Sequence, residues 1–149
     1  MKIIGITCTD EKGYPLAKRV QNSFLYYHPD IPFRIINENE ELKEFGDVRL
    51  YEGSDPHCMV VEQRFVNKLL DTYDLIIVLD IDTVVTARLE EMLTTDFDVA
   101  ASYAIQKSHV KYNAGIYATT SKSFSSEFLE QCYTPKSDEI LVYDRLLNS

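Results

Sequence analysis

The stretch YDLIIVLDIDTVV, residues 73–85, decides the fold class that the sequence predicts. Its apolar run Leu75–Leu79 is typical of a strand buried on both faces, as in parallel sheets. Two acidic residues, Asp80 and Asp82, follow this run with Ile81 between them. Because burying an unpaired carboxylate is costly, the pair needs either a functional or a structural explanation.

Strands and helices are predicted to alternate along the whole chain. The expected strands are residues 2–8, 33–37, 47–51, 75–82, 98–104 and 112–119, and the expected helices are residues 15–27, 56–70, 87–93, 121–132 and 137–148. Such alternation predicts an α/β fold with a mostly parallel central sheet covered by helices. Ligands of these sheets bind beyond the carboxyl ends of the strands, which is where Asp80 and Asp82 stand.

Composition limits the partners that the chain is expected to bind. With 149 residues and a formal net charge of −9, we expect one domain whose main partner is neither a nucleic acid nor an anionic membrane. A phosphate-bearing ligand would then need a cation. Three widely spaced cysteines, Cys8, Cys58 and Cys132, predict reduced thiols in a cytoplasmic protein. No apolar run approaches membrane-spanning length.

The carboxylate pair has a metal-binding and a structural interpretation. In extended backbone, Asp80 and Asp82 would point the same way and Ile81 the other way. Two converging carboxylates suit Mg²⁺ or Mn²⁺. Alternatively, one acid caps a helix that starts near Thr86 and the other pairs with a base such as Arg88.

Two enzyme classes place such a pair after an apolar strand. One is the phosphatases with a nucleophilic aspartate, whose Asp-x-Asp-x-Thr/Val signature DIDTV fits. They also need a late acidic pair, and the only late pair, Asp138-Glu139, is expected to start a helix. Their signature usually lies on the first strand, whereas here it falls past the middle of the chain. The other class is the nucleotide-sugar glycosyltransferases of the GT-A type, in which the pair holds the metal on the donor diphosphate.

Four segments, taken in order, resemble the glycogenin-like, retaining GT-A glycosyltransferases. They are ITCTDEKGYPLAKRVQNSF, RFVNKLLDTYDLIIVLDIDTVV, YNAGIYATT and YDRLLN, and together they span most of the chain. The resemblance implies a Rossmann-like GT-A fold. It also implies that Asp80 and Asp82 coordinate Mn²⁺, or Mg²⁺, which stabilises charge on the leaving diphosphate as a Lewis acid.

The resemblance assigns further residues to the donor, each with a structural alternative. It places Thr7, Thr9 and Tyr14 near the base and ribose, although a tyrosine beside a proline-started helix is also a common core residue. Arg64 would lie near the sugar and phosphates, with Lys68 as its rival and an ordinary surface arginine as the alternative.

The later segments are assigned to the donor sugar. Asn113, Ala114 and Gly115 match the family's sugar-binding segment, although a strand entry with a bulge at Gly115 would explain the same residues. Asp144 stands where the family shows Gln beside an acid and is expected to bind a sugar hydroxyl. Tyr143 replaces that acid, which is a departure from the pattern.

The family usually continues beyond this point and supplies a third metal ligand, normally His, and much of the acceptor site. His57 and His109 do not match that position.

We therefore expect residues 1–149 to form a single GT-A-like domain that is short or truncated at its C-terminus. The expected function is metal-dependent glycosyl transfer from a nucleotide-diphosphate sugar, a UDP-sugar being favoured, with retention and an unknown acceptor. A catalytically incomplete nucleotide-sugar binder and the phosphatase are the alternatives, and homo-oligomerisation stays open.

Overall fold

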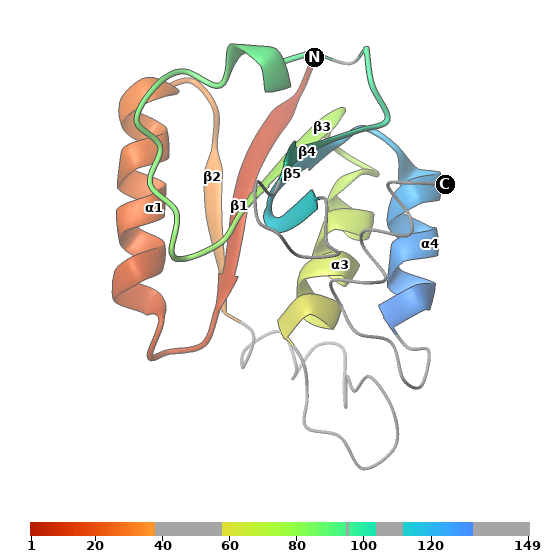
Figure 1. The fold of residues 1–149 in the computed structure, drawn as a ribbon, viewed down its shortest axis with the longest axis horizontal. Coiled ribbons are helices and arrows are strands. Elements are labelled where there is room, and N and C mark those ends of the chain that lie inside the picture. The colour runs from red at the N-terminus through yellow and green to blue at the C-terminus, as the bar shows by residue number, and fades with distance from the viewer. Residues whose placement is uncertain (38–57, 95, 104–111, 133–149) are drawn as a thin grey trace.

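The structure is a computed structural model that describes residues 1–37, 58–94, 96–103 and 112–132 (Figure 1). Predictions for residues 47–51 and 137–148 lie outside this part of the chain. The described elements are β1 (Ile3–Thr9), α1 (Tyr14–Tyr27), β2 (Phe33–Asn37), α3 (Cys58–Leu69), β3 (Leu75–Leu79), the 3₁₀ helix η1 (Glu90–Met92), β4 (Val99–Tyr103), β5 (Tyr112–Thr119) and α4 (Lys122–Cys132).

The five described strands form one sheet in the order β2-β1-β3-β5-β4. β1 pairs in parallel with both β2 and β3, whereas β5 is antiparallel to its two neighbours, β3 and β4. β4 therefore runs in the same direction as β3. The predicted α/β fold with a mostly parallel sheet is confirmed.

Helices cover both faces of the sheet, with α1 on one face and α3 and α4 on the other (Figure 1). Side chains of β3 alternate between these layers: Leu75, Ile77 and Leu79 pack on the α1 side, and Ile76 and Val78 pack on the α3 side. All five are at most 1% exposed. The apolar run is thus a central strand buried on both faces, as its sequence predicts.

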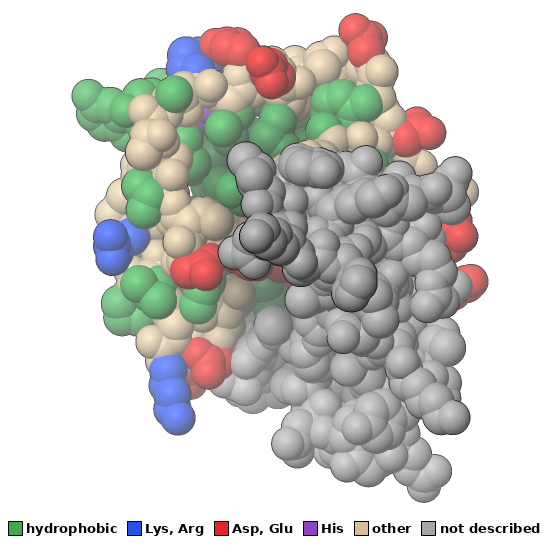
Figure 2. Space-filling model, in the orientation of Figure 1, with side chains coloured by type: hydrophobic (Ala, Val, Ile, Leu, Met, Phe, Trp, Pro, Cys, Tyr) green, Lys and Arg blue, Asp and Glu red, His purple; other side chains and the backbone are tan. Residues whose placement is uncertain are grey.

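Helix α1 has a buried stripe and three exposed apolar side chains. Pro15 stands in its first turn, where the missing amide hydrogen costs nothing. Ala17, Val20 and Phe24 recur at helical spacing and are 0% exposed. The exposed apolar side chains Tyr14, Leu16 and Tyr26 also belong to α1, and Figure 2 shows hydrophobic side chains over this region. In the described residues, no helix is long and apolar enough to cross a membrane.

Two predicted elements after residue 75 were wrong in extent. The expected strand 75–82 ends at Leu79, because the carbonyl of Asp80 accepts hydrogen bonds from Thr83 and closes a turn. The expected helix 87–93 is only η1, Glu90–Met92. In place of the expected first turn, the backbone N–H of Leu89 donates to the His28 side chain at 3.0 Å.

Candidate functional site at the carboxyl ends of β1 and β3

The sheet order creates a crevice between the ends of β1 and β3. From β1 the chain passes through α1 to β2, which lies on one side of β1 in the sheet. It then passes through α3 to β3, which lies on the other side of β1. The helices of these two connections lie on opposite faces of the sheet. A reversal of this kind is the topological switch point at which open α/β sheets bind ligands.

An open pocket of about 470 Å³ lies at this switch point. One part of its described lining runs from the last residues of β1 into α1, and the other follows β3: Cys8, Thr9, Asp10, Leu16, Asp80, Ile81 and Asp82. The volume is within the range of small-molecule sites, about 300–1,000 Å³. Asp80 and Asp82 therefore do reach one common pocket, and both are exposed.

The acids reach the pocket through a turn and not through strand alternation. Backbone N–H of Thr83 donates to Asp80 O at 3.1 Å, and Thr83 Oγ1 donates to the same oxygen at 2.7 Å. The turn also brings Ile81 into the pocket lining. The prediction that Ile81 points to the opposite side was therefore wrong, because the chain leaves the extended conformation after Leu79.

The other wall of the pocket is the short connection from β1 to α1. Asp10 Oδ1 accepts a hydrogen bond from the backbone N–H of Gly13 at 2.8 Å, and Thr9 Oγ1 donates to Asp10 O at 3.1 Å. A Cβ on Gly13 would stand 2.1 Å from Thr9 Oγ1 and 2.9 Å from Ile81 Cδ1. Glycine is needed there so that the two walls can approach each other.

The sequence interpretation did not single out Asp10, which lines the pocket, or Gly13, which packs against Thr9 and Ile81 of its two walls. Asp10 follows the end of β1 in the same way that Asp80 follows β3. An acidic residue after a buried parallel strand was the signal that could have found it.

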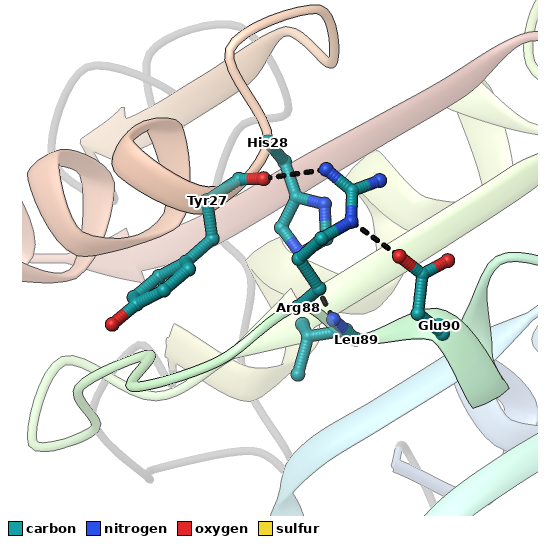
Figure 3. A network of polar contacts seen from close by, with 5 residues as sticks. All are labelled: Tyr27, His28, Arg88, Leu89 and Glu90. Carbon is teal, nitrogen blue, oxygen red and sulfur yellow. Dashed lines mark hydrogen bonds and ion pairs between the residues drawn. The ribbon is translucent and has the colours of Figure 1, made fainter.

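The structural alternative, in which one acid caps a helix near Thr86 and the other pairs with Arg88, was wrong. Arg88 forms an ion pair with Glu90, and its Nη1 donates to the carbonyl of Tyr27 at 2.9 Å (Figure 3). The residue before η1 is Leu89, and no side chain caps this helix. Burial and the charge of Arg88 lower the pKa of His28, whereas the charge of Glu90 acts to raise it. A lowered pKa favours the neutral imidazole, whose Nε2 accepts the N–H of Leu89. Arg88 thus fastens this segment to the end of α1.

Gly115 lies directly beside the acid pair in the sheet. Its carbonyl accepts the backbone N–H of Asp80 at 2.7 Å. On the other edge of β5, Ala101 pairs with Tyr117 but Ser102 pairs with Asn113, so residues 114–116 form an irregularity in the ladder. The bulge expected under the structural alternative is therefore present, and bulges are also common beside active sites. The side chains of Asn113 and Ala114 lie outside the described part of the structure.

The remaining predicted donor residues are not in the described lining of the pocket. Thr7 is 0% exposed, and its Oγ1 has no hydrogen-bond partner among the described residues. Tyr14 starts α1 and is 48% exposed. Arg64 is half-buried on α3. Asp144 lies outside the described residues.

The described lining of the pocket is acidic. It holds Asp10, Asp80 and Asp82, and no lysine or arginine from the described residues. Two exposed carboxylates on one turn offer the hard oxygen ligands that Mg²⁺ and Mn²⁺ prefer. In the described part of the chain, no group of three His, Cys, Asp or Glu could hold a metal ion. Two carboxylates alone would leave most coordination positions of such a cation to other ligands, such as phosphate oxygens.

The fold of this chain is similar to the folds of solved glycosyltransferase structures. The glycosyltransferase GlyE of Streptococcus pneumoniae TIGR4 superimposes with a TM-score of 0.68 at 17% identity, over 99% of this chain and 43% of that chain. An active-site mutant of LgtC gives 0.62 at 14% identity, over 96% and 70%. The galactosyltransferase LgtC with donor and acceptor sugar analogues gives 0.50 at 16%, over 97% and 64%.

The chain thus spans less than half the length of GlyE. No family model matches the chain, and no curated protein matches its sequence. The likeness rests on the three-dimensional arrangement of the strands and helices. The chain has the α/β fold of the GT-A glycosyltransferases.

Proposed function

We propose that this chain is the donor-binding part of a metal-dependent glycosyltransferase that uses a nucleotide-diphosphate sugar, with retention of configuration. The observation that carries the proposal is the pair of exposed carboxylates, Asp80 and Asp82, in a pocket at the switch point of a GT-A fold. The fold alone would not indicate a function, because one fold serves many activities.

The charge of the pocket supports a metal-bound diphosphate. A nucleoside diphosphate would meet Asp10, Asp80 and Asp82, which would repel it. Mn²⁺ or Mg²⁺ held by Asp80 and Asp82 would reverse this repulsion and, as a Lewis acid, stabilise the charge on the leaving diphosphate.

Two of the predicted donor residues have structural support. Thr9 lines the pocket, and the Gly115 carbonyl bonds the Asp80 amide, so the Asn113–Gly115 segment is adjacent to the acid pair. We retain Asn113 and Ala114 as contacts of the sugar. Leu16, also in the lining, offers an apolar wall to the nucleoside.

The other donor residues are retained from the sequence prediction. We propose that Thr7 and Tyr14 contribute near the base and ribose, Arg64 near the phosphates, and Asp144 at a sugar hydroxyl. UDP is the favoured nucleotide. The complex of LgtC with donor and acceptor sugar analogues supports a sugar-donor site in this fold. The acceptor is not assigned, the cytoplasmic location stays a prediction from the sequence, and homo-oligomerisation stays open.

The test is the turnover of UDP-sugars by the full chain with Mn²⁺ and, as the metal-free control, with EDTA. We expect slow release of UDP that requires the metal, because water can replace the acceptor. Metal-dependent UDP binding without turnover would indicate the catalytically incomplete binder. Hydrolysis of a generic phosphate ester, blocked by beryllofluoride, would instead favour the aspartate-nucleophile phosphatase and contradict the proposal.

A further inference from the structure

Thr83 ends the turn that carries the acid pair, and both of its hydrogen-bond donors bond the same atom. Its backbone N–H lies 3.1 Å from the carbonyl oxygen of Asp80, and its Oγ1 lies 2.7 Å from that oxygen. The side chain thus repeats the contact that the backbone makes in an ordinary four-residue turn. Within the described structure, its hydroxyl bonds the residue that carries one of the two acids.

The chain on either side of this turn is fastened independently. Before the turn, the backbone N–H of Asp80 donates to Gly115 O at 2.7 Å. After it, the backbone N–H of Val85 donates to Ser23 Oγ at 3.0 Å, and the Val85 side chain is only 7% exposed. The closure of the turn, between these two anchors, sets where the Asp82 carboxylate lies relative to Asp80.

We infer that the Thr83 hydroxyl is a positioning group for the cation site, holding the Asp80 and Asp82 carboxylates in one geometry. The inference rests on the proposed function, since it assumes that the pair binds a divalent cation. Groups that orient metal ligands without touching the metal typically contribute about 10–100-fold to metal affinity.

The test compares Mn²⁺ affinity, in the presence of saturating UDP, among single variants of the full chain. Thr83→Val keeps the shape of the side chain and removes the hydroxyl, and we expect Mn²⁺ to bind at least about 10-fold more weakly. Thr83→Ser keeps the hydroxyl and should bind Mn²⁺ nearly as the wild type does. Electron paramagnetic resonance of free Mn²⁺ gives the affinity without any activity measurement.

The matched control is Thr120→Val. Thr120 is also half-buried, and its Oγ1 donates to a backbone carbonyl, that of Phe97, at 2.6 Å. It follows the end of β5, which is antiparallel to β3, so it lies at the edge of the sheet opposite the pocket. Removal of the Thr120 hydroxyl should lower the melting temperature about as much as removal of the Thr83 hydroxyl does, and it should leave Mn²⁺ affinity unchanged.

The outcomes separate this inference from the proposed function. Weak Mn²⁺ binding by Thr83→Val, with normal binding by Thr83→Ser and Thr120→Val, supports the positioning role. Three results would overturn the positioning role but not the proposed function. They are wild-type Mn²⁺ affinity in Thr83→Val, an equal loss of affinity in Thr83→Ser, and an equal loss in Thr120→Val. Absence of Mn²⁺ binding by the wild type would overturn the proposed function, and with it the inference.

Discussion

Asp82→Asn is expected to abolish Mn²⁺-dependent binding of UDP and to leave the fold intact. An asparagine oxygen is neutral and is therefore a much weaker ligand for a hard divalent cation than a carboxylate. Changing a group that merely orients a metal ligand costs about 10–100-fold, so loss of a ligand should exceed about 100-fold in affinity. Since Asp82 is exposed and follows the end of β3, the substitution removes no packing from the core.

The measurement is isothermal titration calorimetry of UDP with Mn²⁺ present, together with the melting temperature of each protein. Asp30→Asn is the control, because Asp30 is another exposed aspartate and precedes β2, at the edge of the sheet opposite the pocket. The control should bind UDP as the wild type does. Undiminished binding by Asp82→Asn, independent of metal, would show that the carboxylate pair does not hold a cation.

Gly5→Val should destabilise the protein by about 3 kcal/mol, at the upper end of the range for over-packed cores. A Cβ on Gly5 would stand 2.5 Å from Phe33 Cδ2 and 3.1 Å from Phe24 Cζ. Both rings are buried, at 8% and 0% exposure, and their centroids lie 4.9 Å apart, so neither can move away freely. The valine would force α1 away from the sheet.

Urea denaturation followed by circular dichroism measures this loss. Gly5→Ala should give a smaller loss than Gly5→Val, and Phe33→Leu combined with Gly5→Ala should recover part of it, because leucine leaves room beside the new methyl group. Equal stability of the wild type and Gly5→Val would contradict the packing described between α1 and the sheet.

The layers of the fold were predictable because local patterns and tertiary packing agree. Leu75–Leu79 is continuously apolar and is buried by helices on both faces. The turn from Asp80 to Thr83 was not predictable in the same way, because LDID continues the alternation of a strand. Its closure depends on a hydroxyl and an amide of Thr83 that reach the Asp80 carbonyl, and turn chemistry of this kind leaves little mark on hydrophobic periodicity.

The acid pair and Thr9 were identified from the sequence, but the rest of the described pocket lining was not. Asp10 and Gly13 belong to the wall opposite Ile81, and that wall depends on β1 and β3 being neighbours in the sheet. Strand order is a tertiary property that a single sequence does not state. The expected contributions of Asn113, Ala114 and Asp144 lie outside the described side chains and stay predictions.

The most direct test of a metal site at the acid pair is a crystal of this chain soaked with MnCl₂ and UDP, with diffraction data collected at a wavelength where manganese scatters anomalously. We predict one anomalous peak within bonding distance of the Asp80 and Asp82 carboxylates, with the diphosphate of UDP on its other side. UDP bound without a metal, or manganese bound away from these two residues, would contradict the proposed function.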